Sequence, residues 1–136
     1  MNQRVIGISR GVAAVLAFAM ATYFATDNFG GEPVRTWDNA FLVPDLLIVV
    51  LLGVSALLPL RLARPALMFS LAWGAAVWTT SLSHWFVEGE YGRGVGHLFF
   101  IGPAVIAAAL LARERPVDPR GHSSGAVSDH SASNNA

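Results

Sequence analysis

The chain has 136 residues, of which 54% are hydrophobic and 13% charged, and its nine basic and nine acidic side chains give a formal net charge of zero. This balance is typical of a protein in a lipid bilayer, and the lack of clustered cations excludes nucleic acid as a partner. Because the chain has no cysteine, disulfides, thiol nucleophiles and thiolate metal sites are also excluded.

Four apolar blocks follow one another along the chain. They cover about 5–24, 41–60, 65–87 and 94–112. A helix rises about 1.5 Å per residue and the hydrocarbon core is about 30 Å thick, so each block can cross the bilayer once. Backbone groups in lipid find no water, so the spans should be helices. The sequence predicts an all-α integral membrane four-helix bundle over residues 1–112 with short loops, including a tight hairpin at "PLRLARP".

The arginines predict how these spans are oriented. Most of them flank one side: Arg4 and Arg10 near the start, Arg61 and Arg64 between the second and third blocks, and Arg113, Arg115 and Arg120 after the fourth. Positive side chains favour the cytoplasmic side, so we expect a multi-pass protein with N- and C-termini cytoplasmic. The sequence has no organelle signal, and the expected location is the plasma (inner) membrane of a prokaryote. The first block also has features of a signal peptide, and its cleavage would leave three spans with the same orientation.

The last segment differs in character from the four blocks. Residues 113–136 are rich in Ser, Asn, Gly and Asp and contain almost no large apolar side chain. Such a segment cannot bury enough surface to offset its ordering entropy. It is predicted to be a disordered cytoplasmic tail in which His122 and His130 are solvated.

Asp45 lies near the outer end of the second block and is the first residue of the outer polar layer that falls inside a predicted span. A carboxylate there costs a few kcal/mol unless it is paired, neutralised or hydrated. Three roles are open. It can cap the helix, because Pro44 suits the first helical position; it can bind a ligand or carry a proton; or it can pair with Arg35 or Arg93.

His84, Glu88 and His97 form the second group of candidates. His84 and Glu88 are four residues apart and would share a helix face with Thr80 and Ser81 one turn deeper. His97 lies one turn into the fourth block, and the short "GEYGRG" connection would bring it to about the depth of His84. We therefore predict an outward-facing polar pocket with His84, Glu88, Asp45 and His97 as candidate catalytic residues.

Three kinds of chemistry fit these four residues, and no cofactor is assigned. A metal could be held by His84 and His97 with Glu88 or Asp45, a haem could lie between the two histidines, or the groups could perform acid–base chemistry on a lipophilic molecule. The predicted function is the binding or transformation of a small lipophilic compound at the outer leaflet. The alternative is a non-catalytic accessory subunit of a larger membrane complex. The expected partners besides the lipid bilayer are a small lipophilic ligand and another membrane protein or further copies of this chain.

The orientation is testable with topology reporters. A reporter fused at Ala136 and another inserted near Arg61 should both be active in the cytoplasm, whereas one near Gly31 should be active outside, because the arginines favour the cytoplasmic side. A cytoplasmic reporter at Gly31 would contradict the outward placement of the polar layer.

Overall fold

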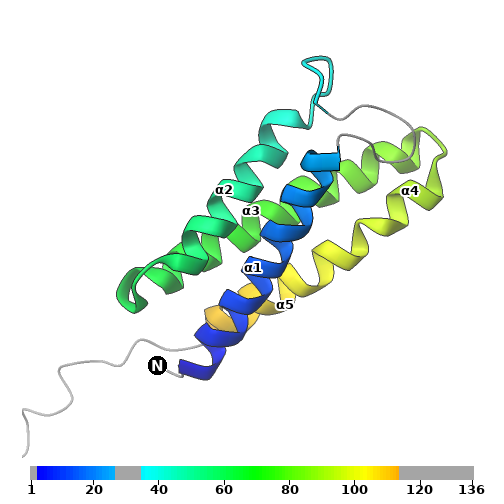
Figure 1. The fold of residues 1–136 in the computed structure, drawn as a ribbon. Helices are drawn as coiled ribbons and strands as arrows, with labels where there is room; N and C mark the ends of the chain where they lie inside the picture. The colour runs from blue at the N-terminus through cyan, green and yellow to red at the C-terminus, as the bar shows by residue number, and fades with distance from the viewer. Residues whose placement is uncertain (1–2, 27–34, 114–136) are drawn as a thin grey trace, which may run out of the picture.

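The computed structural model describes residues 3–26 and 35–113, and every regular element in these ranges is a helix (Figure 1). The helices are α1 (Gln3–Thr26), α2 (Leu42–Leu57), α3 (Leu60–Val87), α4 (Tyr91–Gly96) and α5 (Leu98–Arg113). One residue, His97, separates α4 from α5, and the two count as a single helix over Tyr91–Arg113. The predicted all-helical fold class is confirmed, with four helices in the described part of the chain.

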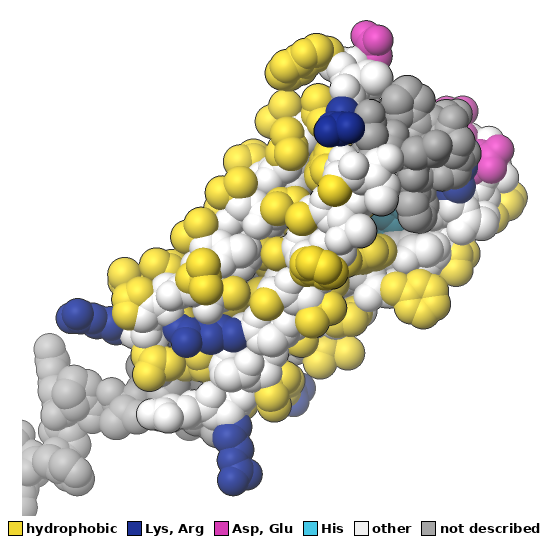
Figure 2. All heavy atoms as spheres, viewed as in Figure 1, with side chains coloured by type: hydrophobic (Ala, Val, Ile, Leu, Met, Phe, Trp, Pro, Cys, Tyr) yellow, Lys and Arg dark blue, Asp and Glu magenta, His cyan; other side chains and the backbone are white. Residues whose placement is uncertain are grey.

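The helices run alternately up and down the long axis of the bundle (Figure 1). α1 packs against α2 and α5, and α3 packs against the same two helices, so each helix lies beside neighbours of opposite direction. In Figure 2 most of the dark blue arginine side chains lie at the end where α1 begins and α5 ends, whereas the acidic side chains, with a few arginines beside them, lie at the opposite end. We call these the arginine end and the acidic end.

The hairpin between α2 and α3 is shorter than the predicted one. Only Leu58 and Pro59 lie between the two helices, so most of "PLRLARP" belongs to α3, with Pro65 in the second turn. The residue before a proline is driven to extended geometry, and Leu58 has φ −61° and ψ 148°. Pro59 therefore ends α2 at Leu57, earlier than the predicted boundary at 60, and α3 begins at Leu60 rather than 65.

Two helices in the described ranges are long and apolar enough to cross a membrane by length and composition, Gln3–Thr26 and Tyr91–Arg113. α2 is apolar but has only 16 residues. Large apolar side chains also cover much of the outside of the bundle (Figure 2). Examples at least half exposed are Phe18 on α1, Val50 on α2, Phe69 on α3 and Phe99 on α5.

The interior is closely packed over most of its length. Ile6, Ile48, Leu52, Leu67, Leu71 and Leu111 are almost completely buried, and alanines at 13, 63, 104 and 107 allow the helices to approach. Between α2 and α3 the hydroxyl oxygens of Ser55 and Ser70 lie 2.9 Å apart. Each hydroxyl is also within hydrogen-bond distance of a carbonyl of its own helix, so these buried polar groups are satisfied.

Two arginine side chains link neighbouring helices at the arginine end of the bundle. The Arg10 side chain donates to the carbonyl of Leu58, which follows α2. Arg64 Nε donates to the carbonyl of Leu111 in the last turn of α5, at 3.2 Å. Carbonyls at a helix C-terminus lack partners within the helix and attract cations. Each arginine thus joins two helices by satisfying a terminal carbonyl.

The predicted disordered tail, with His122 and His130, lies outside the described residues after Arg113.

A matched pair of leucines on α3 tests the packing. Leu71→Ala removes a fully buried side chain and should lower the free energy of unfolding by about 2 to 5 kcal/mol, because a cavity replaces lost contacts. Leu62 is 53% exposed on the same helix, so Leu62→Ala should change it by about 0.5 kcal/mol or less. Thermal and denaturant unfolding in mild detergent would measure both, and equal losses would contradict the described core.

Candidate functional site

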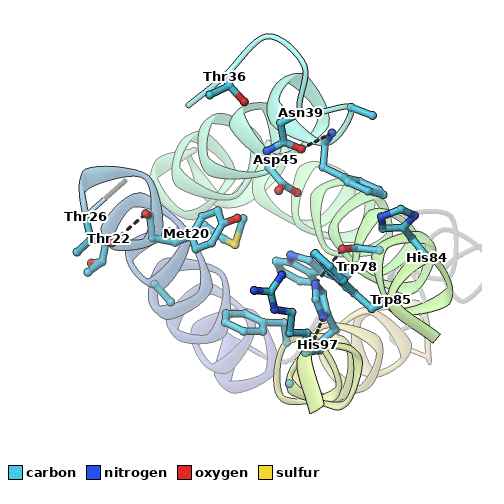
Figure 3. A pocket seen from close by; sticks show the side chains of 18 of the residues that line it. Met20, Thr22, Thr26, Thr36, Asn39, Asp45, Trp78, His84, Trp85 and His97 are labelled. Carbon is cyan, nitrogen blue, oxygen red and sulfur yellow. Dashed lines mark hydrogen bonds between the residues drawn. The ribbon is translucent and has the colours of Figure 1, made fainter. Parts of the chain in front are cut away.

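A pocket of about 790 Å³ lies at the acidic end of the bundle (Figure 3). Its volume is within the usual range of about 300 to 1,000 Å³ for small-molecule sites. All of the helices contribute to its wall, together with the residues before α2. The aromatic lining residues are Tyr23, Phe41, Trp78, Trp85 and Phe100, and the polar ones include Asp38, Asn39, Asp45, Ser81, His84, Arg93 and His97.

The pocket exists because the filling of the bundle changes along its axis. Toward the arginine end, buried Leu, Ile and Ala side chains occupy the interior. At the acidic end, small residues line part of the wall, namely Ala19, Ala40 and Gly96. The space they leave is bordered by rings and polar groups rather than filled by aliphatic side chains, so a cavity remains.

Asp45 points into the space between the helices (Figure 3). Its backbone N–H donates to the carbonyl of Phe41 at 2.9 Å, which makes it part of the first turn of α2. Its carboxylate caps no backbone N–H, and within the described residues it has neither a hydrogen bond nor an ion pair. Within the described residues Asp45 thus makes no capping hydrogen bond and no ion pair with Arg35 or Arg93, but it does lie in the first turn of α2, where the helix dipole favours a negative group.

The start of α2 is organised instead by Asn39, which the sequence analysis missed. Its side-chain oxygen accepts the backbone N–H of Phe41 at 3.0 Å, and its carbonyl accepts the N–H of Leu42 at 3.0 Å. α2 begins at Leu42, so Pro44 is its third residue rather than its first. An asparagine a few residues before an apolar run is a known turn signal, and it could have identified this role.

His97 is held by hydrogen bonds on both ring nitrogens at the junction of α4 and α5. Nδ1 lies 3.1 Å from the carbonyl oxygen of Arg93 and 3.2 Å from that of Gly94. Nε2 lies 2.9 Å from the hydroxyl oxygen of Ser81 on α3. Carbonyls only accept, so we assign the proton to Nδ1, and Nε2 of the neutral ring then accepts the Ser81 hydroxyl.

His84 lies at the border of the same pocket. Its side chain is exposed, and its ring centroid is 5.6 Å from that of Phe41 and 5.3 Å from that of Trp85. His84, His97 and Asp45 all line the pocket, so the structure brings these three candidates together. No hydrogen bond is recorded between the two histidines within the described residues.

Glu88, the fourth candidate, does not line the pocket. It follows the last residue of α3 and is exposed. Its backbone N–H still bonds to the carbonyl of His84 at 3.0 Å, but the chain leaves the helix at Gly89, whose φ of 78° suits glycine. The polar stripe predicted for α3 therefore ends one turn before Glu88 can contribute.

Two further lining residues were not among the candidates. Arg93 places its guanidinium carbon 5.0 Å from the centroid of Trp85, in a cation–π arrangement. Ser81 is buried and bonds to His97. Trp78, Ser81 and Trp85 are spaced i, i+3 and i+7, which places them on one helix face. This spacing is visible in the sequence and could have identified the three residues as one wall of a pocket.

The polar groups define what the site can do chemically. The described residues contain no group of three or more His, Asp or Glu side chains that could hold a metal ion. In the described structure, the buried indole N–H of Trp78 has no hydrogen-bond partner, and the Asp45 carboxylate has none either.

Comparison with known proteins gives no match to a family model, to a curated protein or to a solved structure. Function must therefore be argued from the pocket itself.

The bond between Ser81 and His97 can be tested against a neighbouring serine. Ser81→Ala should lower the free energy of unfolding by about 1 kcal/mol, because it leaves His97 Nε2 unsatisfied. It should also shift the ¹⁵N resonance of that nitrogen. The control is Ser83→Ala on the same helix, because Ser83 is exposed and donates only to the carbonyl of Thr79. Unchanged His97 resonances in Ser81→Ala would contradict the assigned hydrogen bond.

Proposed function

We propose that this chain is a multi-span protein of a prokaryotic plasma membrane whose pocket binds a small lipophilic compound. The observation that carries the proposal is the pocket of about 790 Å³ at the acidic end, with five aromatic lining residues and a few polar groups. Small-molecule sites commonly combine an apolar wall with a small number of fixed polar groups that orient the ligand.

The exposed apolar side chains support placement in a bilayer. Soluble proteins rarely expose large contiguous apolar surfaces, whereas here such side chains occur on α1, α2, α3 and α5. α2 is about 24 Å long at 1.5 Å per residue, shorter than the hydrocarbon core. Trp37, which is 89% exposed just before α2, belongs to a residue type that favours the interface. It would anchor this end at the headgroup level.

The charge distribution supports an outward-facing pocket. Arg4 in the first turn of α1, Arg61 in the first turn of α3 and Arg113 at the end of α5 are exposed at the arginine end, and positive side chains favour the cytoplasmic side. The acidic end, with the pocket, would then face outward. A compound dissolved in the outer leaflet would be at the right depth to enter.

The polar groups of the pocket support a role in ligand binding more directly than a role in proton transfer. Both ring nitrogens of His97 already have partners, so His97 would act as a fixed wall group. A chemical step on the compound would need an available acid or base, and among the described lining residues Asp45 suits this role because its carboxylate is unpartnered. Glu88 lies outside the pocket and has no part in the proposal.

Filling the pocket tests the proposed function. A set of small lipophilic compounds would be screened by thermal unfolding of the purified protein in mild detergent. Ligand at about 100 times its Kd adds about 2.7 kcal/mol of stability, so a true ligand should raise Tm by several degrees. Ala19→Phe, which places a ring in the pocket wall, should abolish this rise.

The matched control is Ala21→Phe on the same helix, because Ala21 is exposed and does not line the pocket. This variant should keep the rise in Tm. If no compound stabilises the wild-type protein, or if both variants retain the effect, the pocket is not a binding site. The accessory-subunit interpretation would then be preferred.

A further inference from the structure

We propose that the compound bound in this pocket is a lipophilic organic cation, with the Asp45 carboxylate as its counter-ion. This inference rests on the proposed function and specifies the chemical class of the ligand. It follows from three features of the described lining residues: an unpaired carboxylate, an arginine that already has a partner, and a wall rich in aromatic rings.

The unpaired carboxylate is the first feature. Asp45 is partly buried in the wall, and its side chain makes no hydrogen bond or ion pair with any described residue. Removing an ionised carboxylate from water is costly unless it gains a cation or a donor. The indole N–H of Trp78 also lacks a partner among the described residues, but it is neutral and therefore costs less to leave unpaired. A positively charged ligand group would pair with the carboxylate, which is the costlier of the two groups to leave without a partner.

The charges around the pocket favour the same sign of ligand. Among the described lining residues, the carboxylates of Asp38 and Asp45 outnumber the single guanidinium of Arg93. That guanidinium lies over the ring of Trp85 at 5.0 Å, so it already has a stabilising contact. An anionic ligand would compete for a partnered cation, whereas a cationic ligand would meet an unpartnered carboxylate.

The aromatic wall is the third feature. Five lining residues are aromatic, and aromatic rings attract cations electrostatically while also burying apolar surface. An amine or quaternary ammonium with an apolar body uses both properties. The apolar body would contact the rings, and the charged group would lie near Asp45.

Three compounds with one skeleton and different charge test this inference. They are 4-phenylbutylamine, 4-phenylbutanol and 4-phenylbutyrate, which are cationic, neutral and anionic at pH 7. Their dissociation constants for the full chain in mild detergent would be measured by calorimetry or by saturation-transfer NMR. The amine should bind at least tenfold more tightly than the alcohol, and the acid should bind most weakly.

Two variants connect the charge preference to one residue. Asp45→Asn has nearly the same shape and breaks no hydrogen bond of the described structure, so it should fold; its affinity for the amine should fall to that for the alcohol, with the alcohol unchanged. Glu88→Gln removes an exposed carboxylate near the same end, outside the pocket, and should retain the full preference.

The other outcomes separate failure of this inference from failure of the proposed function. If amine and alcohol bind wild-type protein equally, the ligand is not selected by charge, although the proposed function stands. If the preference persists in Asp45→Asn, another group provides it. If none of the three compounds binds while other lipophilic compounds raise Tm, only the cation class is wrong; if nothing binds at all, the proposed function fails too. Should Asp45→Asn fail to fold, the wild-type ranking alone decides.

Discussion

The apolar outer surface of the bundle limits where each polar group can lie. Large apolar side chains are exposed on every long helix, so in the proposed bilayer a polar group between the two ends would find partners only inside the protein. Hydroxyls of Thr22, Thr79 and Ser83 donate to carbonyls of their own helices. Arg10 and Arg64 reach terminal carbonyls of other helices. Internal satisfaction of this kind is what a hydrocarbon environment requires.

Against this background, the two ends of the bundle have different roles. At the arginine end, the helices are held together by close apolar packing and by the hydrogen bonds that Arg10 and Arg64 donate to backbone carbonyls. At the acidic end, the bond between Ser81 and His97 joins α3 to the junction of α4 and α5 across the pocket wall. Not every group is satisfied in the described structure: the Asp45 carboxylate has no hydrogen bond or ion pair there, and the buried Ser9 hydroxyl and the indole N–H of Trp78 also lack partners. Under the proposed function, a bound ligand would supply the partner that the Asp45 carboxylate lacks among the described residues.

Hydrophobic blocks predicted the fold class because apolar runs of helical length have few other stable arrangements. The same blocks predicted helix boundaries less well. Pro59 shows why: its restriction of Leu58 fixes the end of α2 within one residue, and the apolar run continues through that point without a break. Local backbone chemistry, rather than hydropathy, determined the boundary there.

The sequence by itself determined the helical class, the separation of arginine-rich from acid-rich ends, and a polar group of residues near the acidic end. It could not determine which of those residues share a pocket, because rotation of each helix about its axis depends on packing against its neighbours. Asp45, His84 and His97 converge, and Glu88 does not, because α3 ends at Val87. The partners of His97, and the lack of a hydrogen bond or ion pair to the Asp45 carboxylate among the described residues, were also decided by tertiary structure, because hydrogen bonds between helices depend on distances that sequence spacing does not fix.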